Sequence, residues 1–236
     1  MKKNLTELVF ILDESGSMSD LTLDTIGGFN SLINKQRSEE GEALVSTVLF
    51  SNRSKVIHDR VKISDIPRMT EKDYVPNGCT ALLDAVGGAI HHIANVHKYA
   101  REEDVPEKTL FIITTDGMEN ASHEYSYEKV KKMIGKEQEK YGWEFIFLGA
   151  NIDSAATART LGIKEENAVD YCPDEAGTAA MYESVACAVG NMRSMACIAP
   201  DWKSSIERDR AKRTPATVPH PEKKRSLFGS LKNKNK

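Results

Sequence analysis

The chain has 236 residues, 40% hydrophobic and 28% charged, and carries a net charge of −3 at pH 7. That composition supports a substantial core, and no run approaches the roughly 18 uninterrupted apolar residues of a membrane-spanning helix. The apolar run Leu8–Leu12 is too short for a secretory signal and lacks a cleavage site, so we expect a cytoplasmic protein. Four scattered cysteines without a C-x-x-C pair argue against a zinc site or a disulfide framework.

Charge is unevenly distributed along the chain. Residues 201–236 contain eleven Lys or Arg and four Asp or Glu, a net charge of +7, which leaves −10 on residues 1–200. This end of the chain is also rich in proline and lacks a periodic apolar pattern, so it cannot bury enough surface to offset its chain entropy. We therefore predict a folded domain over residues 1–199 and a basic, disordered tail over residues 200–236.

The predicted tail contains one segment of mixed character, in which basic residues surround Leu227, Phe228 and Leu231. Such a segment is suited to contact with an acidic partner or an anionic membrane surface, although a solvated flexible end is the simpler interpretation. Contact with nucleic acid would use phosphates alone, so we expect no specific nucleic-acid partner.

The apolar pattern predicts alternating strands and helices over the first 199 residues. Short, nearly continuous apolar runs are typical of strands buried on both faces, whereas spacings of three and four residues predict helices. In chain order, the predicted elements are strand Glu7–Leu12, helix Asp20–Arg37, strand Ala43–Phe50, strand Lys55–Ile63, helix Thr80–Tyr99, strand Leu110–Thr114, helix Ser126–Tyr141, strand Glu144–Leu148, helix Ser154–Leu161, strand Ala168–Tyr171 and helix Glu175–Ile198.

Two of the predicted helices have a clear inner stripe. The predicted inner residues are Leu23, Ile26, Phe29 and Ile33 in the first helix, and Leu83, Val86, Ile90 and Ile93 in the second. His97 lies off the second stripe, so we expect its side chain to point outward.

This order of elements predicts an α/β fold. Alternating strands and helices with two-sided apolar strands indicate a Rossmann-like, doubly wound, mostly parallel sheet with helices on both faces. Strands Ala43–Phe50 and Lys55–Ile63 are close enough in sequence to form a hairpin, which supplies one antiparallel edge strand. Leu110–Thr114 is the most apolar short run, so we place it centrally.

Polar residues gather where ligands bind in such sheets, beyond the carboxyl ends of the strands. Asp13-Glu14-Ser15-Gly16-Ser17 follows the first strand, Thr115-Asp116-Gly117 follows the central strand, and Thr80 opens the second helix. Gly16 permits a tight turn that aims the two serine hydroxyls the same way. The candidate ligands at this rim are Asp13, Ser15, Ser17, Thr80 and Asp116.

The candidate ligands supply two carboxylates and three hydroxyls. Oxygen donors without Cys or His suit a hard cation such as Mg²⁺, Mn²⁺ or Ca²⁺ and not zinc. The few carboxylates favour Mg²⁺, so the sequence predicts a magnesium site at this rim.

The segment Asp13-Glu14-Ser15-Gly16-Ser17 resembles the D-x-S-x-S signature of the von Willebrand factor type A domain with a metal-ion-dependent adhesion site. Thr80 looks like the threonine of that family's second loop, and Asp116 looks like the aspartate of its third. The resemblance covers residues 5–198. It implies a Rossmann-like sheet and a Mg²⁺ that these residues coordinate directly or through water. It also implies an open coordination position that a partner's carboxylate fills, and the small intracellular bacterial or phage type is the most similar.

Ordinary structural roles compete with this interpretation at each position. The serines and Asp116 with Gly117 are suited to turns, and Thr80 is a good helix N-cap. Glu14 and Glu119 lie in the same loops, where solvation is the simpler role. The presence of all the donors at one rim favours a site.

Two functions follow from such a site. A metal-dependent phosphohydrolase would use Asp13 as nucleophile, but Ser15 stands where a general acid would be expected, and both the P-loop pattern and the G-x-S-x-G elbow are absent. We therefore predict a non-enzymatic, metal-dependent protein-binding module whose partner presents Asp or Glu. The sequence leaves the oligomeric state open.

Overall fold

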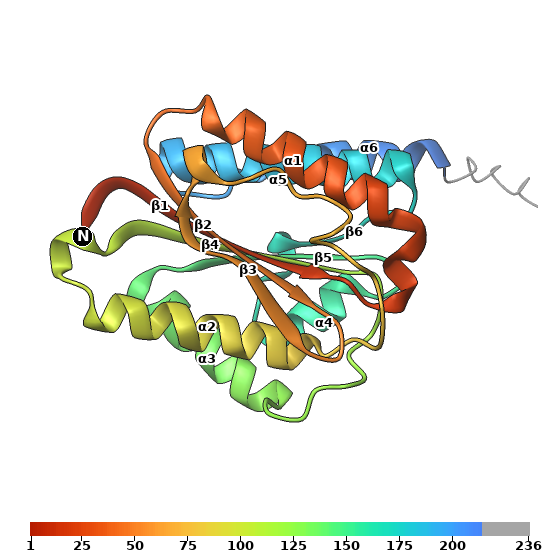
Figure 1. Ribbon diagram of the computed structural model, residues 1–236, viewed down its shortest axis with the longest axis horizontal. Helices are drawn as coiled ribbons and strands as arrows, with labels where there is room; N and C mark the ends of the chain where they lie inside the picture. The colour runs from red at the N-terminus through yellow and green to blue at the C-terminus, as the bar shows by residue number, and fades with distance from the viewer. Residues whose placement is uncertain (214–236) are drawn as a thin grey trace, which may run out of the picture.

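A central sheet organises the computed structural model, which describes residues 1–213 (Figure 1). Its strands are β1 (Lys2–Asp13), β2 (Glu42–Phe50), β3 (Ser54–Lys62), β4 (Pro106–Thr115), β5 (Glu144–Gly149) and β6 (Ala168–Asp170). Their order in the sheet is β3-β2-β1-β4-β5-β6. Neighbouring strands are parallel except β2 and β3, which are antiparallel. The predicted mostly parallel sheet with one antiparallel edge strand is confirmed.

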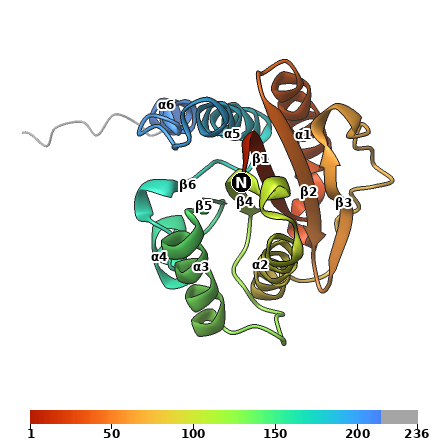
Figure 2. The same ribbon diagram turned by 90° about the vertical axis from the view of Figure 1, so that its left-hand side faces the viewer.

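Helices cover both faces of the sheet. They are α1 (Thr22–Arg37), α2 (Leu82–Tyr99), α3 (Tyr127–Tyr141), α4 (Ser154–Leu161), α5 (Glu175–Met195) and α6 (Ser204–Arg213). Helices α1, α5 and α6 lie on one face and α2, α3 and α4 on the other, as Figures 1 and 2 show from two directions. This arrangement confirms the doubly wound α/β class. Over residues 1–213, no helix has the length and apolar character needed to cross a membrane.

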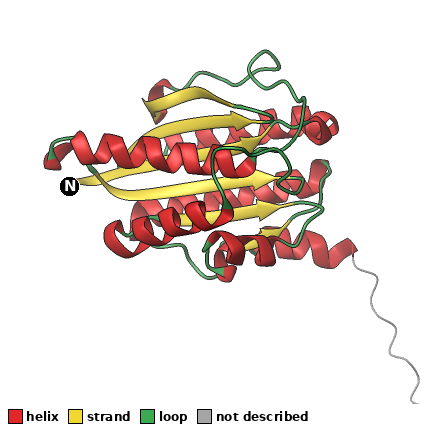
Figure 3. Cartoon of the chain, turned by 90° about the horizontal axis from the view of Figure 1, so that it is seen from below, coloured by secondary structure: helices red, strands yellow, loops and turns green. Residues whose placement is uncertain are grey.

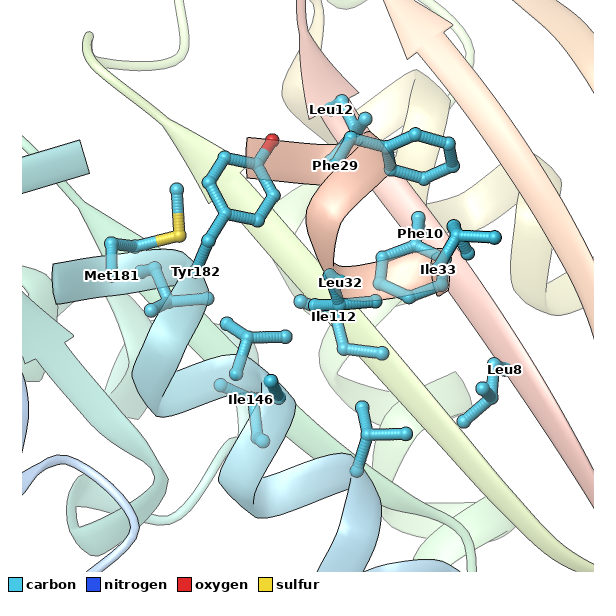
Figure 4. Packing of buried hydrophobic residues seen from close by; sticks show 14 of the residues in the cluster. Leu8, Phe10, Leu12, Phe29, Leu32, Ile33, Ile112, Ile146, Met181 and Tyr182 are labelled. Atoms are coloured by element: carbon cyan, nitrogen blue, oxygen red, sulfur yellow. The ribbon is translucent and has the colours of Figure 1, made fainter. Parts of the chain in front are cut away.

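Alternation along β1 divides the apolar core into two layers. Leu8, Phe10 and Leu12 are buried on the side of α1 and α5, whereas Val9 is buried on the side of α2. Figure 4 shows the first layer, in which Phe29 of α1 packs edge-on against Phe10. Full burial of such a side chain contributes about 1.5–3 kcal/mol, so β1 is held firmly from both sides.

The start of the first helix differs from the prediction. Residues Gly16–Leu21 form a 3-10 turn, and α1 begins only at Thr22. A 3-10 helix has three residues per turn, whereas an α-helix has 3.6. The residues of this segment therefore face the core at positions other than those predicted for a continuous α-helix. Leu23 is consequently 68% exposed, and the buried stripe of α1 begins beyond it at Thr25 and Ile26.

The predicted outward orientation of His97 is wrong. Its Nε2 atom lies 3.2 Å from Oε2 of Glu7, a carboxylate that is fully buried in the sheet and also accepts from Arg60. The imidazole ring packs edge-on against Trp143. A buried carboxylate needs hydrogen-bond donors, so Glu7 draws the histidine inward.

A helix occupies part of the segment that was expected to be disordered. Trp202 and Ile206 are buried, and the Trp202 indole donates to the carbonyl of Glu166 at 3.2 Å. Trp202 lies in the turn that precedes α6 and Ile206 in the first turn of this helix, and both side chains join the core layer that α5 helps to form. The expectation of disorder is therefore wrong for residues 204–213. The basic segment 223–232 lies outside the described residues.

Two adjacent glycines in α1 allow a test of this packing. A Cβ atom on Gly28 would lie 2.0 Å from the ring of Tyr182 on α5, whereas one on Gly27 would meet nothing within 4 Å. We expect Gly28→Ala to destabilise the protein by about 1–3 kcal/mol through overpacking. Gly27→Ala should stabilise it by about 0.5–1 kcal/mol, because alanine favours the helix. Urea denaturation measures both, and equal effects would contradict the α1–α5 contact.

Candidate metal centre

The candidate residues lie at the point where the strand order reverses. From β1 the chain passes to β2 on one side, and β4 then starts the other half of the sheet. Asp13 ends β1, and Asp116 follows the last residue of the neighbouring strand β4. Figure 3 shows the loops that follow the parallel strands gathered at this edge. Such a switch point is where open α/β sheets bind their ligands.

Hydrogen bonds connect four of the five predicted ligands. The Ser15 N–H donates to Oδ1 of Asp13 at 2.7 Å. The hydroxyl oxygens of Ser15 and Ser17 are 3.1 Å apart, and Ser17 donates to Oδ1 of Asp116 at 2.6 Å. A hydroxyl has a single hydrogen, so with Ser17 donating to Asp116 it is Ser15 that donates to Ser17. Residues 99 positions apart in the sequence thus form one polar cluster.

Thr80 completes the group from a second loop. Its hydroxyl oxygen lies beside Gly117, 3.6 Å from the place where a Cβ atom would stand. The backbone of Thr80 is fixed on both sides: its N–H donates to Oδ1 of Asn120 at 2.9 Å, and its carbonyl accepts from the Asn120 N–H at 3.1 Å. Because α2 begins at Leu82 with Ala81 as its N-cap, the N-cap interpretation of Thr80 is wrong. Its side chain is therefore available to the cluster.

Two residues outside the predicted set contact Asp13. The Thr115 hydroxyl donates to Oδ2 of Asp13 at 2.6 Å, so both carboxylate oxygens of Asp13 accept a hydrogen bond. The Tyr74 hydroxyl also donates to the Asp13 carbonyl. The sequence shows that Thr115 lies at the end of an apolar strand. It does not show that the Thr115 hydroxyl contacts Asp13, because that contact requires β4 to pair with β1.

The glycine that takes a left-handed conformation at this rim lies in the second loop and not between the two serines. Gly16 does not lie in the left-handed region, whereas Gly78 has φ of +72°. The Gly78 carbonyl accepts from the Gly16 N–H at 3.1 Å. A Cβ atom on Gly78 would also lie 2.8 Å from Oδ1 of Asn52. Gly78 therefore lets the second loop approach the first.

Two nearby glutamates are occupied elsewhere. Glu14 accepts from the Val75 N–H at 3.3 Å, and burial raises the pKa of its carboxyl group. Glu119 accepts from the N–H groups of Leu83 and Ala121, both at 2.9 Å, which ties its loop to the start of α2. Their contacts support the loops around the cluster, and neither carboxylate belongs to the candidate ligand set.

Burial disfavours the negative charges of the two carboxylates in this cluster. Asp13 is fully buried, and Ser15, Thr80 and Asp116 are nearly so, whereas Ser17 is exposed. Burial raises the pKa of Asp13 above its ordinary value; hydrogen bonds from Thr115 and Ser15 oppose this shift, and the charge of Asp116 adds to it. Among the described ion pairs, none involves Asp13 or Asp116. A divalent cation would compensate both carboxylates, so the donor set fits one.

The described residues contain no other conventional metal site. Within residues 1–213, there is no group of three or more His, Cys, Asp or Glu residues that could hold a metal ion. The hydroxyl-rich cluster at the sheet edge is therefore the metal-site candidate of this part of the chain.

Comparisons of the sequence with protein-family models and with curated proteins give no match. Solved structures do match. Proximal thread matrix protein 1 from the mussel byssus superposes with a TM-score of 0.55 at 17% identity, over 77% of this chain and 45% of its own. A von Willebrand factor type A structure from Catenulispora acidiphila superposes with a TM-score of 0.54 at 14% identity, over 79% of this chain and 42% of its own. Manganese-loaded TRAP protein from Plasmodium vivax superposes with a TM-score of 0.51 at 17% identity, over 77% of this chain and 73% of its own.

These superpositions establish the fold. The chain adopts the von Willebrand factor type A arrangement, a Rossmann-like sheet with one antiparallel edge strand. It spans less than half the length of the mussel and Catenulispora proteins. The manganese belongs to the Plasmodium protein, and one form of the mussel protein, with a TM-score of 0.53 at 13% identity, is described as having a zinc-occupied MIDAS motif.

Proposed function

We propose that this protein is a non-enzymatic binding module that uses a divalent cation to hold an acidic side chain of a partner protein. The observation that carries the proposal is the largely buried cluster at the switch point, which gathers two carboxylates and three hydroxyls. Neither carboxylate has a cationic partner within residues 1–213. The metal-loaded forms of two proteins with this fold add support.

The proposed cation is Mg²⁺, with Mn²⁺ or Ca²⁺ as substitutes. It would supply positive charge for an anionic ligand, and all the donors that would hold it are oxygens, the ligand type that such cations prefer. Thr115 holds the Asp13 carboxylate in place. The residues proposed to hold the cation are Asp13, Ser15, Ser17, Thr80 and Asp116.

The exposed side of the cluster suggests how a partner would bind. Ser17, which links Ser15 to Asp116, is exposed, whereas Asp13 is fully buried. A ligand would therefore approach from the side of Ser17. An aspartate or glutamate is the protein side chain that best matches a hard cation with an open coordination position.

The geometry of Asp13 disfavours the phosphohydrolase alternative. Each of its carboxylate oxygens accepts a hydrogen bond, and the side chain is fully buried. A nucleophile needs an exposed oxygen directed at the substrate. Turnover of a generic phosphate ester in Mg²⁺ that disappeared in Asp13→Ala would overturn the non-enzymatic proposal.

A capture experiment tests the proposed function. The native chain is immobilised and exposed to cell extract, once in Mg²⁺ and once in EDTA. The Asp13→Ala variant is immobilised in the same way and exposed to the extract in Mg²⁺. We expect a partner to be retained only by the native chain in Mg²⁺, since the other two conditions remove the cation. Retention of the same proteins in all three conditions would show that binding does not depend on the metal.

A further inference from the structure

A groove runs between helix α2 and edge strand β3, beside the candidate metal centre. It has a volume of about 590 Å³, within the range of protein ligand sites. Its lining includes apolar side chains of the core, among them Val9, Val48, Ala85 and Ala89, with the exposed Val56 at its side. The groove therefore offers an apolar floor that is open to solvent.

A glycine of α2 lines this groove. Gly87 is required by packing, because a Cβ atom there would lie 2.2 Å from the ring of Tyr125. The next residue, Gly88, lines the groove, and a Cβ atom on it would meet nothing within 4 Å. Glycine inside a helix costs about 1 kcal/mol relative to alanine. The packing of the described residues does not require a glycine at position 88, so a larger side chain can be placed there to probe the groove.

The groove adjoins the second loop of the metal centre. Asn52 lines it, and Oδ1 of Asn52 accepts from the N–H of Cys79 at 2.6 Å. The neighbouring carbonyl of Ser51 accepts from Ala81 at 2.8 Å. These two bonds flank Thr80, so a chain bound at the metal could continue directly into the groove.

The charges around the groove indicate what would occupy it. Its rim carries the carboxylates of Asp59, Asp84 and Glu124 against the guanidinium of Arg53. His92 also lies there, paired with Asp59 at 2.8 Å. Residues 1–200 as a whole have a net charge of −10. A second acidic group would be repelled here, whereas a lysine or arginine would be attracted.

We propose that the groove binds an extended segment of the partner protein, next to the acidic residue held at the metal. This segment carries an apolar side chain for the groove floor and a lysine or arginine for its acidic rim. The inference rests on the proposed function and adds a chemical description of the partner.

The test uses a phage-displayed library of short random peptides, selected on the full chain in Mn²⁺ and eluted with EDTA. We expect recovered peptides to combine one Asp or Glu with a nearby apolar residue and a Lys or Arg. Gly88→Met should place a long side chain in the groove from a position where the Cβ atom is unobstructed, and should weaken the binding of these peptides by at least about tenfold. Gly135→Met is the matched control, since a Cβ atom on Gly135 of α3 also meets nothing within 4 Å.

The outcomes separate the groove from the metal site. Mn²⁺ affinity, measured by calorimetry, should be equal in the native chain and both variants. Equal peptide binding by Gly88→Met and Gly135→Met would overturn the groove proposal, as would recovered peptides that are uniformly acidic. Mn²⁺ binding without any EDTA-sensitive peptide would also overturn it. A native chain that binds no Mn²⁺ would instead contradict the proposed function itself.

Discussion

Asp13→Asn should weaken the binding of Mn²⁺ by at least about a hundredfold, a loss of about 2.7 kcal/mol. The substitution removes one of the two buried carboxylates of the cluster and keeps its size. The amide oxygen can still accept from the Ser15 N–H, and the Thr115 hydroxyl can accept from the new amide N–H. We therefore expect the variant to remain folded. Isothermal titration calorimetry measures the affinity, and circular dichroism checks the fold.

Glu14→Gln is the matched control for this experiment. Glu14 is also buried and adjoins Asp13 in the sequence, but its carboxylate accepts from Val75 and lies outside the proposed ligand set. We expect its Mn²⁺ affinity to stay within a few-fold of the native value. If both variants lost binding to the same extent, overall charge and not coordination by Asp13 would account for the effect.

Arg193→Met should lower the free energy of unfolding by about 2–4 kcal/mol. Arg193 lies near the end of α5, and its guanidinium donates to the side-chain oxygen of Gln36 at 3.0 Å and to the carbonyls of Glu39 and Gly41 at 3.1 and 2.9 Å. It also donates to the Gln36 carbonyl. These acceptors follow or end α1, where carbonyl groups lack helical partners. Methionine preserves the apolar contacts but removes the guanidinium donors from these acceptors.

Denaturation in guanidinium chloride measures this change, with Arg159→Met as the control. Arg159 forms an ion pair with Glu165, but its side chain is 65% exposed. Exposed pairs contribute little to stability, so we expect no measurable change. Equal destabilisation by both substitutions would show that the buried contacts of Arg193 are unimportant.

Much of the fold could be predicted because the apolar pattern is local. The helix over Ser154–Leu161 was predicted with its observed bounds, and Asp153 caps it by accepting from Ala156 at 2.9 Å. Strand β5 differs from its predicted range by one residue. The face of a strand or helix that becomes buried is determined by the spacing of its apolar residues, which explains this agreement.

Features that depend on contacts between distant elements were not predictable in the same way. Trp202 and Ile206 form too short an apolar pattern to indicate a helix, and α6 is stabilised by its contact with α5. The inward turn of His97 depends on Glu7, which is 90 residues away in the sequence. Arg60 reaches the same carboxylate from the edge strand β3. Each of these interactions depends on which elements meet in the fold, and residue spacing does not specify that.

The candidate site shows the same division. The sequence alone determined the donor types and their positions after apolar strands, because a D-x-S-x-S segment and two further oxygen donors are visible in the chain. Only the tertiary structure placed β4 beside β1, and with it the Thr115 hydroxyl against Asp13 and the Ser17 hydroxyl against Asp116. The chemistry of a ligand belongs to its side chain, whereas its distance from another ligand is set by the packing of the whole sheet.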